Sequence, residues 1–85
     1  MYDEIILDCR ELEAPEPLNL AVSTLPKLSD TCYIKMIHRL EPMMLLNILK
    51  ENNYDYSIQH TQSEVLIYIY KQNEKIEEYI QCLQD

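Results

Sequence analysis

The chain has 85 residues, a mass of 10.2 kDa and a formal net charge of −8, with 15 acidic residues against seven lysines and arginines. This length fits one small domain, and the acidic balance disfavours binding to nucleic acid or to anionic membranes, because such binding depends on neutralising phosphates. The chain contains no glycine, which excludes phosphate-binding loops, dinucleotide-binding turns and nucleophile elbows, since each needs glycine backbone.

The first quarter of the chain predicts a strand followed by a helix. The isoleucine-rich run from Glu4 to Cys9 is typical of a buried strand. Pro15 and Pro17 begin the helix, because proline is tolerated in the first turn, where the N–H groups have no intrahelical partner. Residues at helical spacing predict one apolar face, made of Leu18, Ala21, Val22 and Leu25.

The same pattern follows a second time. Alternating side chains over Thr31 to His38 predict a second strand. Glu41 and Pro42 begin a second helix, which continues to Asn52. Asn53 then takes the left-handed position after the helix, which glycine usually occupies.

The last third of the chain predicts two strands and a helix. The strands cover Tyr54 to Thr61 and Glu64 to Lys71, and the amphipathic helix covers Asn73 to Gln84, with Asn73 as its N-cap. The fourth strand is apolar on both sides, which is typical of a strand covered on both faces. We therefore expect the C-terminal helix, or a partner chain, to cover the sheet face that the first two helices leave bare.

The element order β-α-β-α-β-β-α predicts an α/β fold of the two-layer α+β sandwich type, with a four-stranded mixed sheet and an extra C-terminal helix. The two β-α-β crossovers predict parallel neighbouring strands, and the last hairpin adds an antiparallel strand. We assign residues 1–71 to the sandwich domain and 72–85 to the additional helix.

Three cysteines are present, Cys9, Cys32 and Cys82, without the spacing of a disulfide framework or a zinc site. Together with the lack of an export signal, this predicts a cytoplasmic chain with reduced thiols, no metal and no cofactor. Cys9 and Cys32 should lie at opposite ends of the sheet, so a disulfide between them is not expected.

The candidate site is the sheet edge where the first two strands end. If these strands are parallel neighbours, the loops after them share one edge, where α/β folds commonly bind ligands. Two helix N-termini favour an anion there, and the only two arginines of the chain lie in these loops. The candidate binding residues are Arg10, Glu13, Pro15, Glu16, Pro17, His38, Arg39, Glu41 and Pro42.

A plainer interpretation of the same residues stays open. Glu16 and Glu41 suit the positive ends of the helix dipoles without any ligand. The arginines suit surface ion pairs with these carboxylates, which contribute about 0–1 kcal/mol. A lone histidine at a strand end, such as His38, is more often structural than a ligand.

The segment Leu7 to Pro17 resembles the signature D-x-R-G-L-x-C-P-x-P of the TusA/SirA/YedF family of small sulfur carriers. The matching positions are Asp8, Arg10, Leu12, Pro15 and Pro17. The resemblance implies the two-layer β-α-β-α-β-β fold of that family over roughly residues 4–71. It also implies that Ala14 stands where the carriers have the cysteine that takes up sulfur, and that Glu11 replaces the glycine of the signature.

A methyl group cannot be persulfurated, so the chain lacks the family's carrier chemistry. The stretch from His38 to Pro42, H-R-L-E-P, resembles the H-x-x-E-P motif of a cysteine-less branch of TusA-related domains of unknown function. This second resemblance implies that the chain is similar to this uncharacterised branch, and the missing cysteine implies a non-catalytic role.

These observations predict a small cytoplasmic binding or regulatory domain, with no enzymatic activity assigned. Its partner at the candidate edge is a protein or a small anionic ligand, with neither nucleic acid nor membrane involved. One alternative is a thiol, redox or sulfur-transfer protein that uses Cys9 near His38. Another is a structural subunit that associates through the tyrosine-rich sheet face and the C-terminal helix. A homodimer is a further alternative for the partner.

Overall fold

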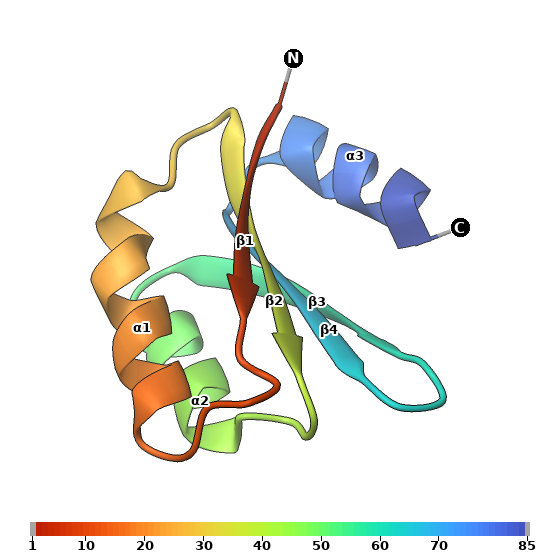
Figure 1. Ribbon diagram of the computed structural model, residues 1–85. Helices are drawn as coiled ribbons and strands as arrows, with labels where there is room; N and C mark the ends of the chain where they lie inside the picture. Colours follow the sequence, from red (N-terminus) through yellow and green to blue (C-terminus); the bar gives the residue numbers. More distant parts are fainter. Residues whose placement is uncertain (1, 85) are drawn as a thin grey trace.

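The computed structural model describes residues 2–84 and contains a four-stranded mixed sheet with helices on both of its faces (Figure 1). Its elements are β1 (Asp3–Asp8), α1 (Glu16–Thr24), a 3₁₀ turn (Leu25–Lys27), β2 (Cys32–His38), α2 (Met43–Glu51), β3 (Tyr54–His60), β4 (Val65–Lys71) and α3 (Glu74–Gln84). The predicted fold class is confirmed, and the predicted element boundaries differ from the observed ones by one or two residues.

The strand order is β1-β2-β4-β3, with β1 and β2 parallel and β4 antiparallel to both of its neighbours. The prediction of two parallel neighbouring pairs is therefore right for the first crossover and wrong for the second, because β4 lies between β2 and β3. The reason is burial. β4 is apolar on both sides and gains most from the centre of the sheet, whereas one side of β3 carries Asp55, Ser57 and Gln59, which suits an edge.

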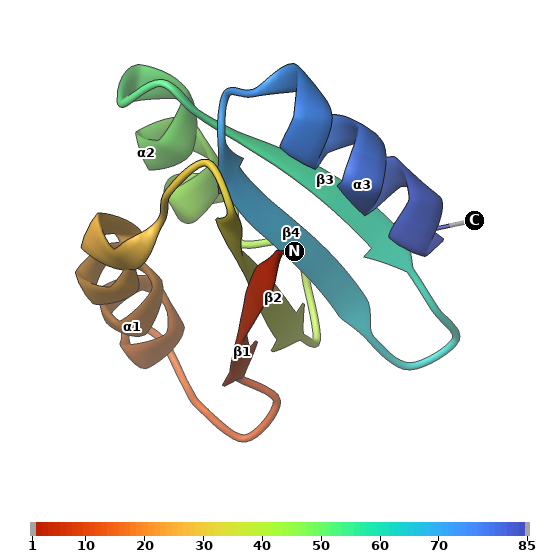
Figure 2. The same cartoon turned by 90° about the horizontal axis from the view of Figure 1, so that it is seen from above.

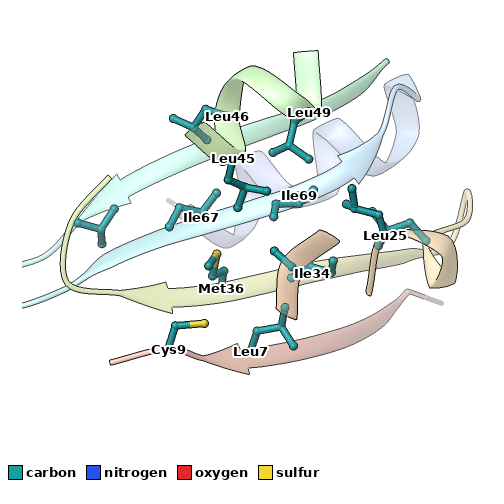
Figure 3. Packing of buried hydrophobic residues seen from close by; sticks show 13 residues of the cluster. Leu7, Cys9, Leu25, Ile34, Met36, Leu45, Leu46, Leu49, Ile67 and Ile69 are labelled. Atoms are coloured by element: carbon teal, nitrogen blue, oxygen red, sulfur yellow. The ribbon is translucent and has the colours of Figure 1, made fainter. Parts of the chain in front are cut away.

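The sheet separates two hydrophobic cores. The larger core lies between the sheet and the helices α1 and α2, and Figure 3 shows Cys9, Met36 and Ile67 within it. The smaller core lies on the other face, where Ile76 and Ile80 of α3 pack against three buried tyrosines, Tyr33, Tyr68 and Tyr70. The C-terminal helix thus covers the face that α1 and α2 leave bare, as Figure 2 shows from above.

The buried face of α1 differs from its prediction at one position. Ala21 and Leu25 are buried and Leu18 is partly buried, as expected, but Val22 is 40% exposed. Thr24 is buried instead, and its hydroxyl donates to the Leu20 carbonyl at 2.7 Å. The hydroxyl is satisfied inside the helix, so Thr24 can face the core, while Val22 lies about 100° around the helix from Ala21.

Two asparagines occupy special backbone positions, one in the left-handed conformation and one as a helix N-cap. Asn53 has a φ of 63°, so it takes the predicted left-handed position between α2 and β3. The Asn73 side chain accepts a hydrogen bond from the Lys75 N–H at 2.9 Å and caps α3, as predicted. Both predictions from the sequence are confirmed.

The parallel register of β1 and β2 places the following loops at one edge of the sheet. Asp3 lies opposite Cys32 at one end, and the Cys9 N–H donates to the Ile37 carbonyl at 2.8 Å at the other. Cys9 and Cys32 therefore lie at opposite ends, as expected, and all three cysteines are free. β1 ends at this edge with Asp8 and β2 ends there with His38, so the loops that follow both strands begin side by side.

Candidate functional site

A groove of about 320 Å³ lies between the loop after β1 and the loop after β2. The Arg39 guanidinium joins the two loops, since its Nη2 donates to the Leu12 carbonyl at 3.3 Å. The starts of α1 and α2 complete the walls. The lining residues are Leu12, Glu13, Ala14, Pro15, Pro17, Leu18, His38, Arg39, Leu40, Pro42 and Met44.

The structure brings together six of the nine predicted site residues. Those that line the groove are Glu13, Pro15, Pro17, His38, Arg39 and Pro42. The three that do not are Arg10, Glu16 and Glu41. The lining also includes Ala14, whose exposed methyl group offers no nucleophile.

Apolar side chains at the groove were missed by the sequence reasoning. Leu40 is 60% exposed and Met44 is 69% exposed, and both line the groove together with Leu12 and Leu18. Met43, the neighbour of Met44, is 59% exposed. The sequence gives no clear signal for them, because an apolar residue near a helix start is usually part of the core, and only the packed structure shows Leu40 and Met44 to be exposed. Clustered exposed apolar side chains of this kind mark contact surfaces.

Arg10 does not line the groove and forms ion pairs. Its Nη2 and Nε bond to both carboxylate oxygens of Asp8 at 2.6 and 2.9 Å, and its Nη1 bonds to Glu64 at 2.7 Å. The hydrogen bonds from Arg10 lower the pKa of Asp8 to about 2. Arg10 and Asp8 are exposed and Glu64 is only partly buried, so the pairs add little to stability, but they connect the loop after β1 to the start of β4.

Glu16 and Glu41 also have structural surroundings. Glu16 lies in the first turn of α1, where a carboxylate suits the helix dipole. Glu41 bonds to His60 at 2.9 Å and connects the start of α2 to the end of β3. For these two residues and for Arg10, the plainer interpretation describes their observed contacts.

His38 is held in one orientation at the groove wall. Its side chain is 7% exposed, and Nδ1 accepts hydrogen bonds from the backbone N–H groups of Arg39 at 2.8 Å and Leu40 at 3.4 Å. Burial, and next the charge of Arg39, lower the pKa of His38. The imidazole is therefore neutral at pH 7, and because Nδ1 is an acceptor, the proton is on Nε2.

The Nε2–H group of His38 has no acceptor among residues 2–84. Within the described residues, only Nε2 of Gln84 is a fully buried polar side-chain atom without a hydrogen-bond partner. The Nε2 atom of His38 is therefore not fully buried. His38, a residue that lines the groove, thus keeps a hydrogen-bond donor without an acceptor among the described residues.

The neutral state of His38 predicts a pH dependence of folding. A lowered pKa means that the unfolded chain binds the proton more tightly, so the contribution of His38 is complete above its ordinary pKa of 6.5 and is lost as the pH falls below it. We expect the urea midpoint to fall between pH 7 and pH 5, and to fall less in His38→Asn. An equal fall in both proteins contradicts this account.

Cys9 lies inside the larger core and not at the groove. Its side chain is 0% exposed, and Figure 3 shows it beside Leu7 and Met36. Burial, followed by the Asp8 charge, raises the pKa of the Cys9 thiol. A buried thiol with a raised pKa is a poor nucleophile, so this geometry opposes thiol chemistry by Cys9 and His38.

The burial of Cys9 predicts its reactivity. In the folded protein we expect iodoacetamide to modify the exposed Cys82 quickly and to leave Cys9 unmodified until the protein unfolds. Peptide mass mapping after short exposure, with and without urea, measures this. Modification of Cys9 at the rate of Cys82 in the native protein contradicts the structure.

The described residues were also searched for metal and membrane sites. Within residues 2–84, no three His, Cys, Asp or Glu side chains gather closely enough to hold a metal ion. None of the helices in this part of the chain combines the length and apolar character that crossing a membrane requires.

Comparisons with known proteins add no relative to this description. No family model, no curated protein and no solved structure matches the chain. The role of the groove is therefore inferred from its own residues.

Proposed function

We propose that this protein is a non-catalytic, TusA-like binding or regulatory domain whose groove binds a short apolar segment of a protein partner. The observation that carries the proposal is the apolar groove at the common end of β1 and β2. Ala14 supports a non-catalytic role, because it lines the groove where the resembling carriers have their cysteine.

The lining favours a protein segment over a small anion. Arg10 was one reason to expect a small anionic ligand at this edge, but its charge is paired with Asp8 and Glu64. A volume of about 320 Å³ is near the lower limit of ligand pockets, which measure roughly 300–1,000 Å³. Exposed Leu40 and Met44 extend the apolar surface beyond this volume, as an interface with a larger molecule requires.

Charge indicates which segment fits. Glu13 lines the groove and Glu16 is the first residue of the adjoining helix α1, both exposed and neither in an ion pair within residues 2–84. The protein as a whole carries a net charge of −8. A segment with apolar side chains flanked by lysine or arginine therefore complements the groove and its rim. The Nε2–H of His38 supplies a donor for a backbone carbonyl of that segment.

The two alternatives have less support. The thiol alternative needs a reactive Cys9, which is fully buried. The structural alternative needs an open tyrosine-rich sheet face, but α3 covers Tyr33, Tyr68 and Tyr70.

The experiment uses the methionine methyl groups as reporters. Met36 is 0% exposed in the core, while Met44 lines the groove. Protein labelled with ¹³C at the methionine methyls is titrated with the peptide Lys-Lys-Leu-Leu-Lys-Lys and followed by NMR. Two control peptides carry serines in place of leucines, or glutamates in place of lysines.

We expect the lysine-flanked leucine peptide to shift the Met44 methyl signal saturably, with a weak dissociation constant of about 0.1–1 mM, and to leave Met36 in place. Both control peptides should bind at least several-fold more weakly. Equal shifts with the serine peptide contradict an apolar site, and no shift with any peptide contradicts the proposal.

A further inference from the structure

We propose that a second copy of this chain pairs with the free edge of β3, antiparallel and about a two-fold axis at Ser57, which joins the two sheets into one. This inference is independent of the groove. It follows from the hydrogen-bond phase of β3, the residues that the pairing places opposite each other, and the charges beside them.

The backbone of β3 has the correct phase for this pairing. The Thr61 N–H points toward β4, since it donates to the Glu64 carbonyl at 2.9 Å. Because the direction alternates along an antiparallel strand, the N–H and C=O groups of Tyr54, Tyr56, Ile58 and His60 point away from β4. The Tyr56 N–H confirms the alternation, because it bonds to the Asp55 carboxylate at 2.8 Å and not to β4.

With the two-fold axis at Ser57, the backbone N–H and C=O groups that point away from β4 in one copy lie opposite the same kind of groups in the other copy. Tyr56 then faces Ile58 of the second copy, and Tyr54 faces His60 of the second copy. Each such pair exchanges two bonds, so full pairing of the strand forms about eight backbone hydrogen bonds. The whole length of β3, from Tyr54 to His60, takes part.

The side chains brought together are compatible. On the sheet face covered by α1 and α2, Tyr56 lies opposite Ile58 of the second copy. Such a pair of an aromatic and a β-branched side chain stabilises sheets. On the other side, Asp55 meets Gln59 of the second copy, whose amide can donate to the carboxylate. Within the paired strands no like charges face each other, and the strand contains no proline and no lysine. On the side of Asp55 and Gln59, Ser57 donates to the Gln84 side chain at 2.9 Å, so the last turns of α3 from both copies lie near the axis.

Charge on α2 supports the same arrangement. Lys50 lies over the Tyr56 ring with its Nζ 5.9 Å from the ring centre, and Glu41 bonds to His60. The helix thus runs beside β3 in the opposite direction. In the proposed dimer the two-fold axis sets the two α2 helices antiparallel and directs Lys50 of each copy toward the Glu41 end of the other, and the adjacent Glu51 offsets part of this attraction.

The other edge of the sheet lacks these properties. β1 carries Asp3, Glu4 and Asp8, and an antiparallel pair of β1 strands in full register places the Asp3 and Asp8 carboxylates opposite each other. Charged residues on an edge strand are a common protection against pairing. On β3 the only acid is Asp55, and its bond to the Tyr56 N–H is replaced in the dimer by backbone pairing.

Sedimentation velocity of the full chain at rising concentration tests the pairing. We expect a reversible monomer–dimer equilibrium between about 10 μM and 1 mM, as suits a small interface. Because each copy carries a net charge of −8, the dimer should strengthen as salt rises from about 20 to 300 mM. A protein that stays monomeric throughout overturns the proposal.

Substitutions at one position give opposite expected results. Gln59→Glu places like charges opposite Asp55 at two symmetric places and should weaken the dimer about 2- to 30-fold, whereas Gln59→Lys should strengthen it by a similar factor. The matched controls Gln81→Glu and Gln81→Lys make the same charge changes on the exposed face of α3. Their effects should be much smaller.

The double variant Asp55→Lys with Gln59→Glu checks the register. It restores opposite charges only if residues 55 and 59 face each other, so it should associate more tightly than Gln59→Glu alone. Equal effects at positions 59 and 81, or no recovery in the double variant, overturn this pairing. Circular dichroism of each variant establishes that it is folded.

Discussion

Replacing Ile80 with alanine is expected to lower the free energy of unfolding by about 2–4 kcal/mol. Ile80 is 0% exposed and packs, with Ile76, against Tyr33, Tyr68 and Tyr70. This smaller core has few members, so the cavity left by the lost side chain cannot be filled by neighbours. Stability in a domain of this size is of the order of 5–10 kcal/mol, so the loss is a large fraction of the total.

Urea unfolding followed by circular dichroism measures the effect, with Gln81→Ala as the control on the exposed face of the same helix. The control should change stability by less than about 0.5 kcal/mol. If Ile80→Ala is no more destabilising than Gln81→Ala, α3 is not docked on the sheet and the covered tyrosine face must be reconsidered.

Replacing Met44 with aspartate is expected to weaken binding of the lysine-flanked leucine peptide by roughly 30-fold, which corresponds to about 2 kcal/mol for a central contact residue. Met44 lines the groove and is 69% exposed. A carboxylate there loses its hydration when the leucines of the peptide bind beside it, and this cost exceeds the added attraction for the peptide lysines, which lie at the rim of the groove.

Met43→Asp is the matched control. Met43 is the preceding residue, it is 59% exposed, and the substitution makes the same change of charge. It does not line the groove, so its effect on peptide binding should be several-fold smaller. Both variants should keep the unfolding midpoint of the wild type, because neither side chain is in the core. Equal losses of binding at positions 43 and 44 contradict a binding site confined to the groove.

The sequence predicts the elements of this fold well because its local signals agree with its packing. The proline-led helix starts, the left-handed Asn53 and the Asn73 cap all depend on chemistry within a few residues. The position of β4 between β2 and β3 depends on the relative burial of whole strands, which local patterns do not specify. Val22 fails for a related reason, since the width of a helix's buried stripe is set by the surface it meets.

The location of the candidate site was predicted from the sequence, but the apolar nature of its lining was not. Parallel pairing of β1 and β2 brings both loops to one edge, as the sequence indicated. The chemistry differs because long-range contacts decide which groups stay free. Glu64, far along the chain, pairs with Arg10, and this pairing cannot be seen in either loop. Leu40 and Met44 look like core residues in the sequence, and only the packing of α2 shows that they are exposed.

The most direct test of the groove as a binding site is photocrosslinking in the cells where the protein is made. A benzophenone amino acid replaces Leu40 in one variant and Gln81 on the far face of α3 in another. The groove account predicts a defined protein adduct from position 40, absent from position 81 and lost when Met44→Asp is added. Adducts that are the same from both positions, or no adduct from position 40, contradict it.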